Sequence, residues 1–105
     1  VYDGLEAHDR VFYKGQGKPD YSGFQGINRN RISLHEYLQL AGITHVDVCG
    51  IAGDFCVKET ALDAVKNNYQ VRVLPELVAS VGGEEATQET VGFIHMQQYY
   101  RDGFV

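Results

Sequence analysis

The stretch "CGIAGDFCVKETALDAV", from Cys49 to Val65, joins a short apolar run to an amphipathic segment through a cluster of small residues. A strand that leads through a tight turn into a helix is typical of an α/β protein. Cys56 stands at the head of that helix. Its thiol is open to four interpretations: a packed small hydrophobe, half of a disulfide, a metal ligand or a nucleophile.

The segments on either side of this stretch alternate between strand and helix patterns. The predicted strands are short and apolar, at residues 10–14, 45–51 and 70–74, the last ended by Pro75. The predicted helices lie between Ser33 and Gly42, over about fourteen residues from Asp54, and at residues 84–100, and residues 15–30 are predicted to form a loop. Such alternation implies parallel strands joined by right-handed crossovers, so the fold class is α/β.

The composition excludes several classes of protein. The 105 residues carry a net charge of −5, and their nine Lys and Arg residues form no run, which argues against nucleic-acid binding. No apolar run is long enough for a membrane span and no targeting peptide is visible, so a cytoplasmic location is expected. Cys49 and Cys56 miss the C-x-x-C spacing of zinc and redox sites, and we expect both to be reduced thiols.

Topology alone predicts that Lys14 and Cys56 meet. Lys14 ends one predicted strand and Cys56 lies just past the end of another, and the carboxyl ends of parallel strands lie at one edge of a sheet. A nearby ammonium and the unpaired N–H groups of a first helical turn both favour a thiolate. The same N–H groups can accept the oxyanion of an acyl-transfer reaction. The plainer alternatives are a solvated Lys14 and a packed cysteine, and packing is the role predicted for Cys49 inside its strand.

Two motifs resemble a known family. The segment "GIAGDFCVKETALDAV" is similar to the nucleophile segment of the isochorismatase-like cysteine hydrolases, and within them of the nicotinamidase/pyrazinamidase group. "VFYKG", followed by "YSGF", is similar to the segment that carries the lysine and a pocket tyrosine of that group. The resemblance implies a three-layer α/β/α fold with a parallel sheet, present in incomplete form in this chain.

The resemblance also implies roles for individual residues. Cys56 is the expected nucleophile and Lys14 the lysine of a Cys-Asp-Lys triad. A cis peptide is expected between Ile51 and Ala52, with the amides of Ala52 and Cys56 as the oxyanion hole. Tyr21 and Phe24 are expected to line the pocket. The implied reaction is hydrolysis of nicotinamide, or of pyrazinamide-like amides, to the acid and ammonia through a cysteine thioester, in NAD salvage.

The chain departs from the family pattern in two ways. The family's aspartate and the ligands of its divalent metal (zinc, iron or manganese) lie upstream of the lysine segment, and neither set is found in this sequence. The four histidines show no ligand spacing, so no metal site is expected within the chain. Asp54 is predicted to accept backbone N–H bonds at the start of its helix and not to replace the missing acid.

Residues 1–105 are therefore expected to form the C-terminal part of a single isochorismatase-like domain. Alone, this part is expected to be inactive and to associate with the missing N-terminal part of the same protein or with copies of itself. Three alternatives remain: a hydrolase of the same fold for another small amide, a non-catalytic remnant or binding module, and thiol redox chemistry between Cys49 and Cys56.

Overall fold

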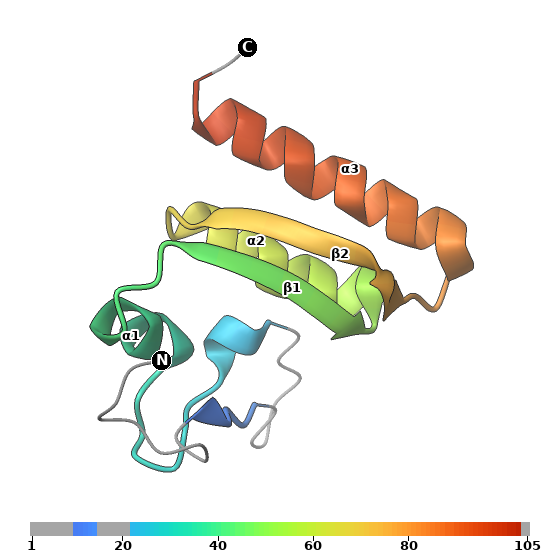
Figure 1. Cartoon of the computed structure of the whole chain (residues 1–105). Helices are drawn as coiled ribbons and strands as arrows, with labels where there is room; N and C mark the ends of the chain where they lie inside the picture. The colour runs from blue at the N-terminus through green and yellow to red at the C-terminus, as the bar shows by residue number, and fades with distance from the viewer. Residues whose placement is uncertain (1–9, 15–21, 104–105) are drawn as a thin grey trace.

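The described residues form a parallel β-sheet flanked by helices. The computed structural model describes residues 10–14 and 22–103. Its elements are η2 (Gly23–Gln25), α1 (Leu34–Leu40), β1 (His45–Ile51), η3 (Gly53–Val57), α2 (Lys58–Lys66), β2 (Gln70–Ala79) and α3 (Gly83–Arg101). β1 and β2 pair in parallel, with Val46 opposite Val71 and Val48 opposite Val73. Figure 1 shows α2 behind this sheet and α3 alongside β2. The predicted α/β class with a parallel sheet is confirmed.

The core lies on one face of the sheet. Inward residues of η3 and α2 pack with residues of β2 and α3 in one buried cluster: Val57, Ala61, Ala64, Val65, Tyr69, Val71, Val73 and Ile94. The two alanines are fully buried, which lets α2 approach the sheet closely. The stripe predicted for this helix, from Val57 to Val65, is therefore the one that is buried.

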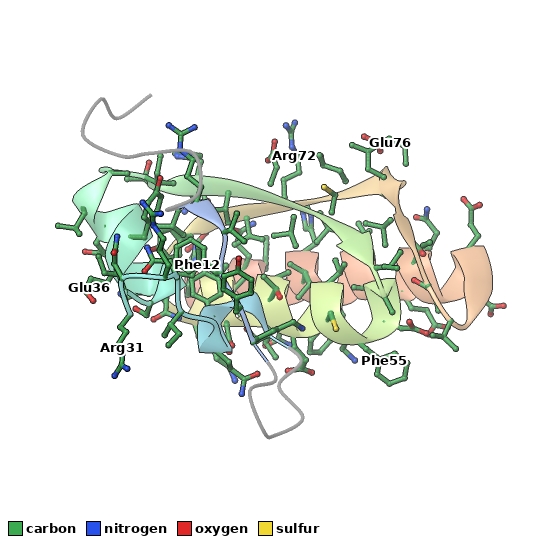
Figure 2. The ribbon with its side chains drawn as sticks, turned by 90° about the horizontal axis from the view of Figure 1, so that it is seen from below. Phe12, Arg31, Glu36, Phe55, Arg72 and Glu76 are labelled. Atoms are coloured by element: carbon green, nitrogen blue, oxygen red, sulfur yellow. The ribbon has the colours of Figure 1, made fainter. Side chains whose placement is uncertain are left out.

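The opposite face of the sheet is covered by no helix among the residues that the structure describes. β1 alternates strictly, with His45, Asp47, Cys49 and Ile51 exposed. Figure 2 shows Arg72 and Glu76 projecting from the side of the sheet away from α2. The prediction of a buried strand with a packed Cys49 is wrong, because only one face of β1 meets the helices. Asp47 in the middle of the strand is the sequence signal of that alternation.

The end predicted for β2 at Pro75 is also wrong, since the strand continues to Ala79. The register explains how proline is accommodated. Val48 pairs with Val73 but Gly50 pairs with Val78, so several residues of β2 bulge out opposite Cys49. Pro75 lies in this irregular part, where no ladder hydrogen bond requires its missing N–H group.

The segment before α1 departs most from the prediction. Residues 10–14 form no strand of the parallel sheet, because Tyr13 instead makes an isolated antiparallel bridge to Ile27. The two residues exchange both backbone hydrogen bonds, at 2.9 and 3.1 Å, which satisfies Tyr13 locally. The predicted loop contains η2, closed by a capping box of Ser22 and Gln25. The S-x-x-Q spacing of these two residues was a signal that could have predicted the helical turn.

The helices otherwise follow the predicted boundaries. Ser33 caps α1 by accepting the amide of Glu36 at 3.2 Å, and Gly42 follows with a positive φ of 70°. α3 opens with the acidic residues Glu84 and Glu85. The helix predicted from Asp54 begins as the π-helical turn η3 and becomes α-helical at Lys58. No helix of the described residues is long and apolar enough to cross a membrane.

Candidate active site

Lys14 and Cys56 meet in the structure, 42 residues apart in the sequence. The Nζ atom of Lys14 lies 3.2 Å from the Sγ atom of Cys56, and both side chains are half-buried. The Tyr13–Ile27 bridge, directly before Lys14, fixes the backbone from which the lysine reaches the thiol. The predicted meeting is therefore observed, although Lys14 arrives from a bridged loop and not from a parallel strand. The Lys14 ammonium donates a hydrogen bond to the cysteine sulfur across this contact.

The turn that carries Cys56 is tightly organised. The peptide bond between Ile51 and Ala52 is cis, at the position that the family resemblance implies. The Ala52 carbonyl oxygen accepts the amides of Phe55 at 3.1 Å and Val57 at 2.9 Å, the amides on either side of Cys56. These bonds produce the π-helical turn η3 between β1 and α2. Single π-turns are frequent at functional sites.

Side chains around Cys56 fix the orientation of this turn. Val57 is buried in the core, whereas Phe55 is 45% exposed and projects outward in Figure 2. Cys56 lies between them, so its thiol is neither sealed in the core nor fully in solvent. Gly53 approaches the end of β2 so closely that a methyl group there would overlap Ser80 Oγ and lie 2.5 Å from Val78 Cγ1. Only glycine fits that contact.

The "YSGF" segment packs against the helix that follows Cys56. The amide of Gly23 donates to Thr60 Oγ1 at 2.7 Å, one turn beyond the nucleophile turn. The ring of Phe24 packs against the core and lies 5.9 Å, between ring centroids, from Tyr69. Tyr21 lies outside the described residues. Thr60 is a positioning contact that sequence reasoning missed, because a threonine inside an amphipathic helix carries no local signal of its partner.

Asp54 accepts backbone amides from a turn outside its own helix. Its Oδ1 accepts the amide of Val81 at 3.0 Å and its Oδ2 that of Gly82 at 2.9 Å. Hydrogen bonds from two backbone amides, mainly that of Gly82 and also that of Val81, lower the pKa of the Asp54 carboxyl below its ordinary value. The prediction of an ordinary helix-terminal acid thus needs correction, since the carboxylate joins η3 to the turn after β2.

Cys49 and the histidines lie apart from the Lys14–Cys56 contact. Both cysteines are free thiols, and Cys49 is exposed on the uncovered sheet face. The ring Nδ1 of His35 lies 2.9 Å from the Tyr69 hydroxyl, and that of His45 lies 2.8 Å from Thr44 Oγ1. His95 is exposed and His8 lies outside the described residues. Over residues 10–14 and 22–103, no group of three or more His, Cys, Asp or Glu side chains could hold a metal ion.

Comparisons with known proteins relate the chain to one family. Residues 3–101 match the model of the isochorismatase domain. The chain is 46% identical to a nicotinamidase/pyrazinamidase of Mycobacterium tuberculosis over 74% of its own length and 42% of the relative's. It is 38% identical to a nicotinamidase of Escherichia coli over 63% of its length and 32% of the relative's.

Solved structures give the same result. The structure of a pyrazinamidase of Pyrococcus horikoshii in complex with zinc matches with a TM-score of 0.65 at 31% identity, over 77% of this chain and 42% of that one. The chain thus spans less than half the length of the curated relatives that it matches. The domain match, the parallel sheet and the cysteine turn together establish that this chain belongs to the isochorismatase family.

Proposed function

We propose that the protein containing this chain is an amidase that hydrolyses nicotinamide, and pyrazinamide-like amides, with Cys56 as its nucleophile. The observation that carries the proposal is the 3.2 Å contact between Lys14 Nζ and Cys56 Sγ at the carboxyl end of β1. Ligands of open parallel sheets bind at that end of the strands. The names of the relatives, which are nicotinamidases and pyrazinamidases, support the choice of substrate.

The proposed reaction proceeds through a covalent thioester. The Cys56 thiolate attacks the amide carbonyl carbon, and a C–S bond forms as the carbonyl oxygen becomes an oxyanion. The C–N bond then breaks, and the nitrogen takes a proton and leaves as ammonia. Water adds to the thioester, the C–S bond breaks, and the carboxylic acid leaves with the thiol regenerated. Lys14 donates a hydrogen bond to the sulfur before attack and again after release.

The oxyanion is assigned to the backbone of the nucleophile turn. The amides of Ala52 and Cys56 are proposed to donate to it, one on each side of the Gly53–Phe55 turn. The Ala52 carbonyl, by accepting the amides of Phe55 and Val57, holds the backbone around these two N–H groups. Preorganised donors of this kind cost little rearrangement during the reaction, which is why they accelerate acyl transfer.

The pocket and the pathway belong to the same proposal. Phe24 and Tyr21 are proposed to line the site for a flat pyridine or pyrazine ring. The contact of Gly23 with Thr60 supports this, because it holds the "YSGF" segment against the helix of Cys56. The product acid of nicotinamide is a precursor for NAD, so the proposed role is NAD salvage.

This chain does not supply every group of the reaction. The proton-transferring aspartate of the triad is expected upstream of Lys14, as the family resemblance implies. The described residues do not fit a metal site, so no step is assigned to a metal ion. The zinc in the Pyrococcus structure supports the proposal that the full-length protein binds a divalent ion through residues outside this part of the chain.

The experiment is a paired substitution in the full-length protein, with ammonia release from nicotinamide as the measurement. Cys56→Ala should abolish turnover and leave the fold intact, because half-buried cysteine and alanine differ little in volume. Cys49→Ala is the matched control and should retain activity, since Cys49 lies within β1, apart from the Lys14–Cys56 contact. Substantial turnover by Cys56→Ala would show that Cys56 is not the nucleophile. If the unmodified protein hydrolyses other small amides but not nicotinamide, the proposed substrate is wrong.

A further inference from the structure

The nucleophile turn is fastened to a second segment through one carboxylate. Asp54 is the second residue of η3, two positions before Cys56, and its two oxygens accept the amides of Val81 and Gly82 at 3.0 and 2.9 Å. Val81 and Gly82 form the turn between β2 and α3. The carboxylate therefore joins parts of the chain that are 27 and 28 residues apart in sequence.

The surroundings leave little freedom for this junction to shift. A methyl group at Gly82 would lie 2.8 Å from Ala86 Cβ and 3.4 Å from Asp54 Oδ2, so the turn approaches both α3 and the carboxylate closely. On its other side, Gly53 contacts Ser80, whose hydroxyl lies 2.7 Å from that of Thr87. Contacts on both sides of Asp54 thus fix η3 against the start of α3.

We propose that Asp54 is a positioning residue, which holds the η3 turn through the amides of Val81 and Gly82 and thereby keeps Cys56 Sγ within contact distance of Lys14 Nζ. The inference rests on the proposed function only in giving Cys56 the role of nucleophile. Asp54 touches neither the thiol nor, in this account, the substrate. Its effect passes through the backbone of Phe55, the one residue that separates it from Cys56.

Charge alone makes the opposite prediction, which allows a clean test. A carboxylate near a thiol disfavours the thiolate, so removing its charge without moving the backbone should accelerate alkylation of Cys56. Releasing the turn should instead slow alkylation, because Lys14 and Cys56 separate. A doubling of their distance weakens the attraction enough to slow the reaction about threefold, even with the dielectric constant of water.

The experiment measures iodoacetamide alkylation of Cys56 in the 105-residue chain, with Cys49 in the same molecule as the internal reference. Asp54→Asn retains the size of the side chain but loses one of the two amide acceptors and the charge. Its Cys56-to-Cys49 rate ratio should fall, because the loss of about threefold through distance outweighs the gain from the removed charge, which does not touch the thiol. Glu59→Gln, which removes a negative charge from the first turn of α2, is the matched control and should leave the ratio unchanged or raise it.

Two further variants keep the test decisive. In a Lys14→Ala background, Asp54→Asn should lower the ratio no further, since the contact that it positions is already lost. Gly82→Ala leaves every charge in place but displaces the turn, and should lower the ratio in the same direction. This variant answers the question if Asp54→Asn does not fold.

An unchanged or raised ratio in Asp54→Asn would overturn the positioning role. So would a full additional effect of this change in the Lys14→Ala background. None of these rates depends on nicotinamide. A failure of the positioning proposal is therefore distinct from a failure of the proposed amidase activity, which ammonia release reports separately.

Discussion

Lys14→Ala tests the electrostatic role of the contact that carries the proposed function. Lys14 Nζ lies 3.2 Å from Cys56 Sγ. Two unit charges at that separation attract by about 1.3 kcal/mol even with the dielectric constant of bulk water, and by more beside protein. About 1.4 kcal/mol corresponds to a factor of ten, so loss of this attraction should slow alkylation of Cys56 roughly tenfold in the variant.

The assay is the alkylation rate of Cys56 at about pH 6, below the range in which cysteine thiols ordinarily ionise. Mass spectrometry separates the two thiols, and the exposed Cys49 reports any general change in reagent or solvent conditions. Lys66→Ala is the matched control, because it also removes one positive charge, from an exposed position in the last turn of α2.

The expected result is a roughly tenfold slower reaction at Cys56 in Lys14→Ala, with Cys49 unchanged and Lys66→Ala close to the unmodified chain. The difference should persist at physiological salt, since ions screen a pair in direct contact only partly. If Cys56 reacts at the same rate with and without Lys14, the ammonium does not stabilise the thiolate and the reasoning fails.

Three further outcomes follow from other contacts. Gly53→Ala should destabilise the fold by about 1–3 kcal/mol, because the added methyl group overpacks against Ser80 and Val78. Gly92→Ala, with open space around it in α3, should instead stabilise the fold by about 0.5–1 kcal/mol. Urea unfolding measures both free energies, and equal effects of the two substitutions would refute the close contact at Gly53. Because hydrogen bonds lower the pKa of Asp54, its stabilisation should be complete above the ordinary carboxyl pKa of 3.8 and lost as pH falls through the lowered value. The stability difference between the unmodified chain and Asp54→Asn should therefore shrink in acid, and a difference independent of pH would contradict this assignment. The uncovered sheet face, where Ile51 is 76% exposed and Leu77 58%, should make the isolated chain associate at low micromolar concentration, and a stable monomer in sedimentation would refute this.

The hydrophobic periodicity and the helix-end residues of the sequence predicted most of the strand and helix bounds. β1 has the predicted bounds, His45–Ile51, and α3 differs from its prediction by one residue at each end. The buried stripe of α2 followed from helical periodicity, which a sequence carries. The meeting of Lys14 with Cys56 was predicted from topology and is observed, but Lys14 reaches the thiol from a bridged loop and not from the predicted parallel strand.

Features that depend on distant partners could not be read from the sequence. A proline ordinarily ends a regular strand, but β2 continues past Pro75 because a bulge opposite Cys49 removes the need for the missing N–H group. Residues 10–14 have strand-like composition, yet Tyr13 finds its partner in Ile27. Asp54 has the position of a helix-terminal acid, and only the folded chain shows that its carboxylate binds the turn at Val81 and Gly82.

The most direct test of the central claim is a search for the covalent intermediate on Cys56. The full-length protein is mixed with nicotinamide, quenched in acid within the first turnovers and digested, and the peptide that contains Cys56 is examined by mass spectrometry. The account predicts a nicotinoyl thioester on Cys56, absent from the peptide of Cys49 and discharged by hydroxylamine. Steady release of ammonia with no acyl group on Cys56 at any quench time, and with Cys56→Ala still active, would contradict it.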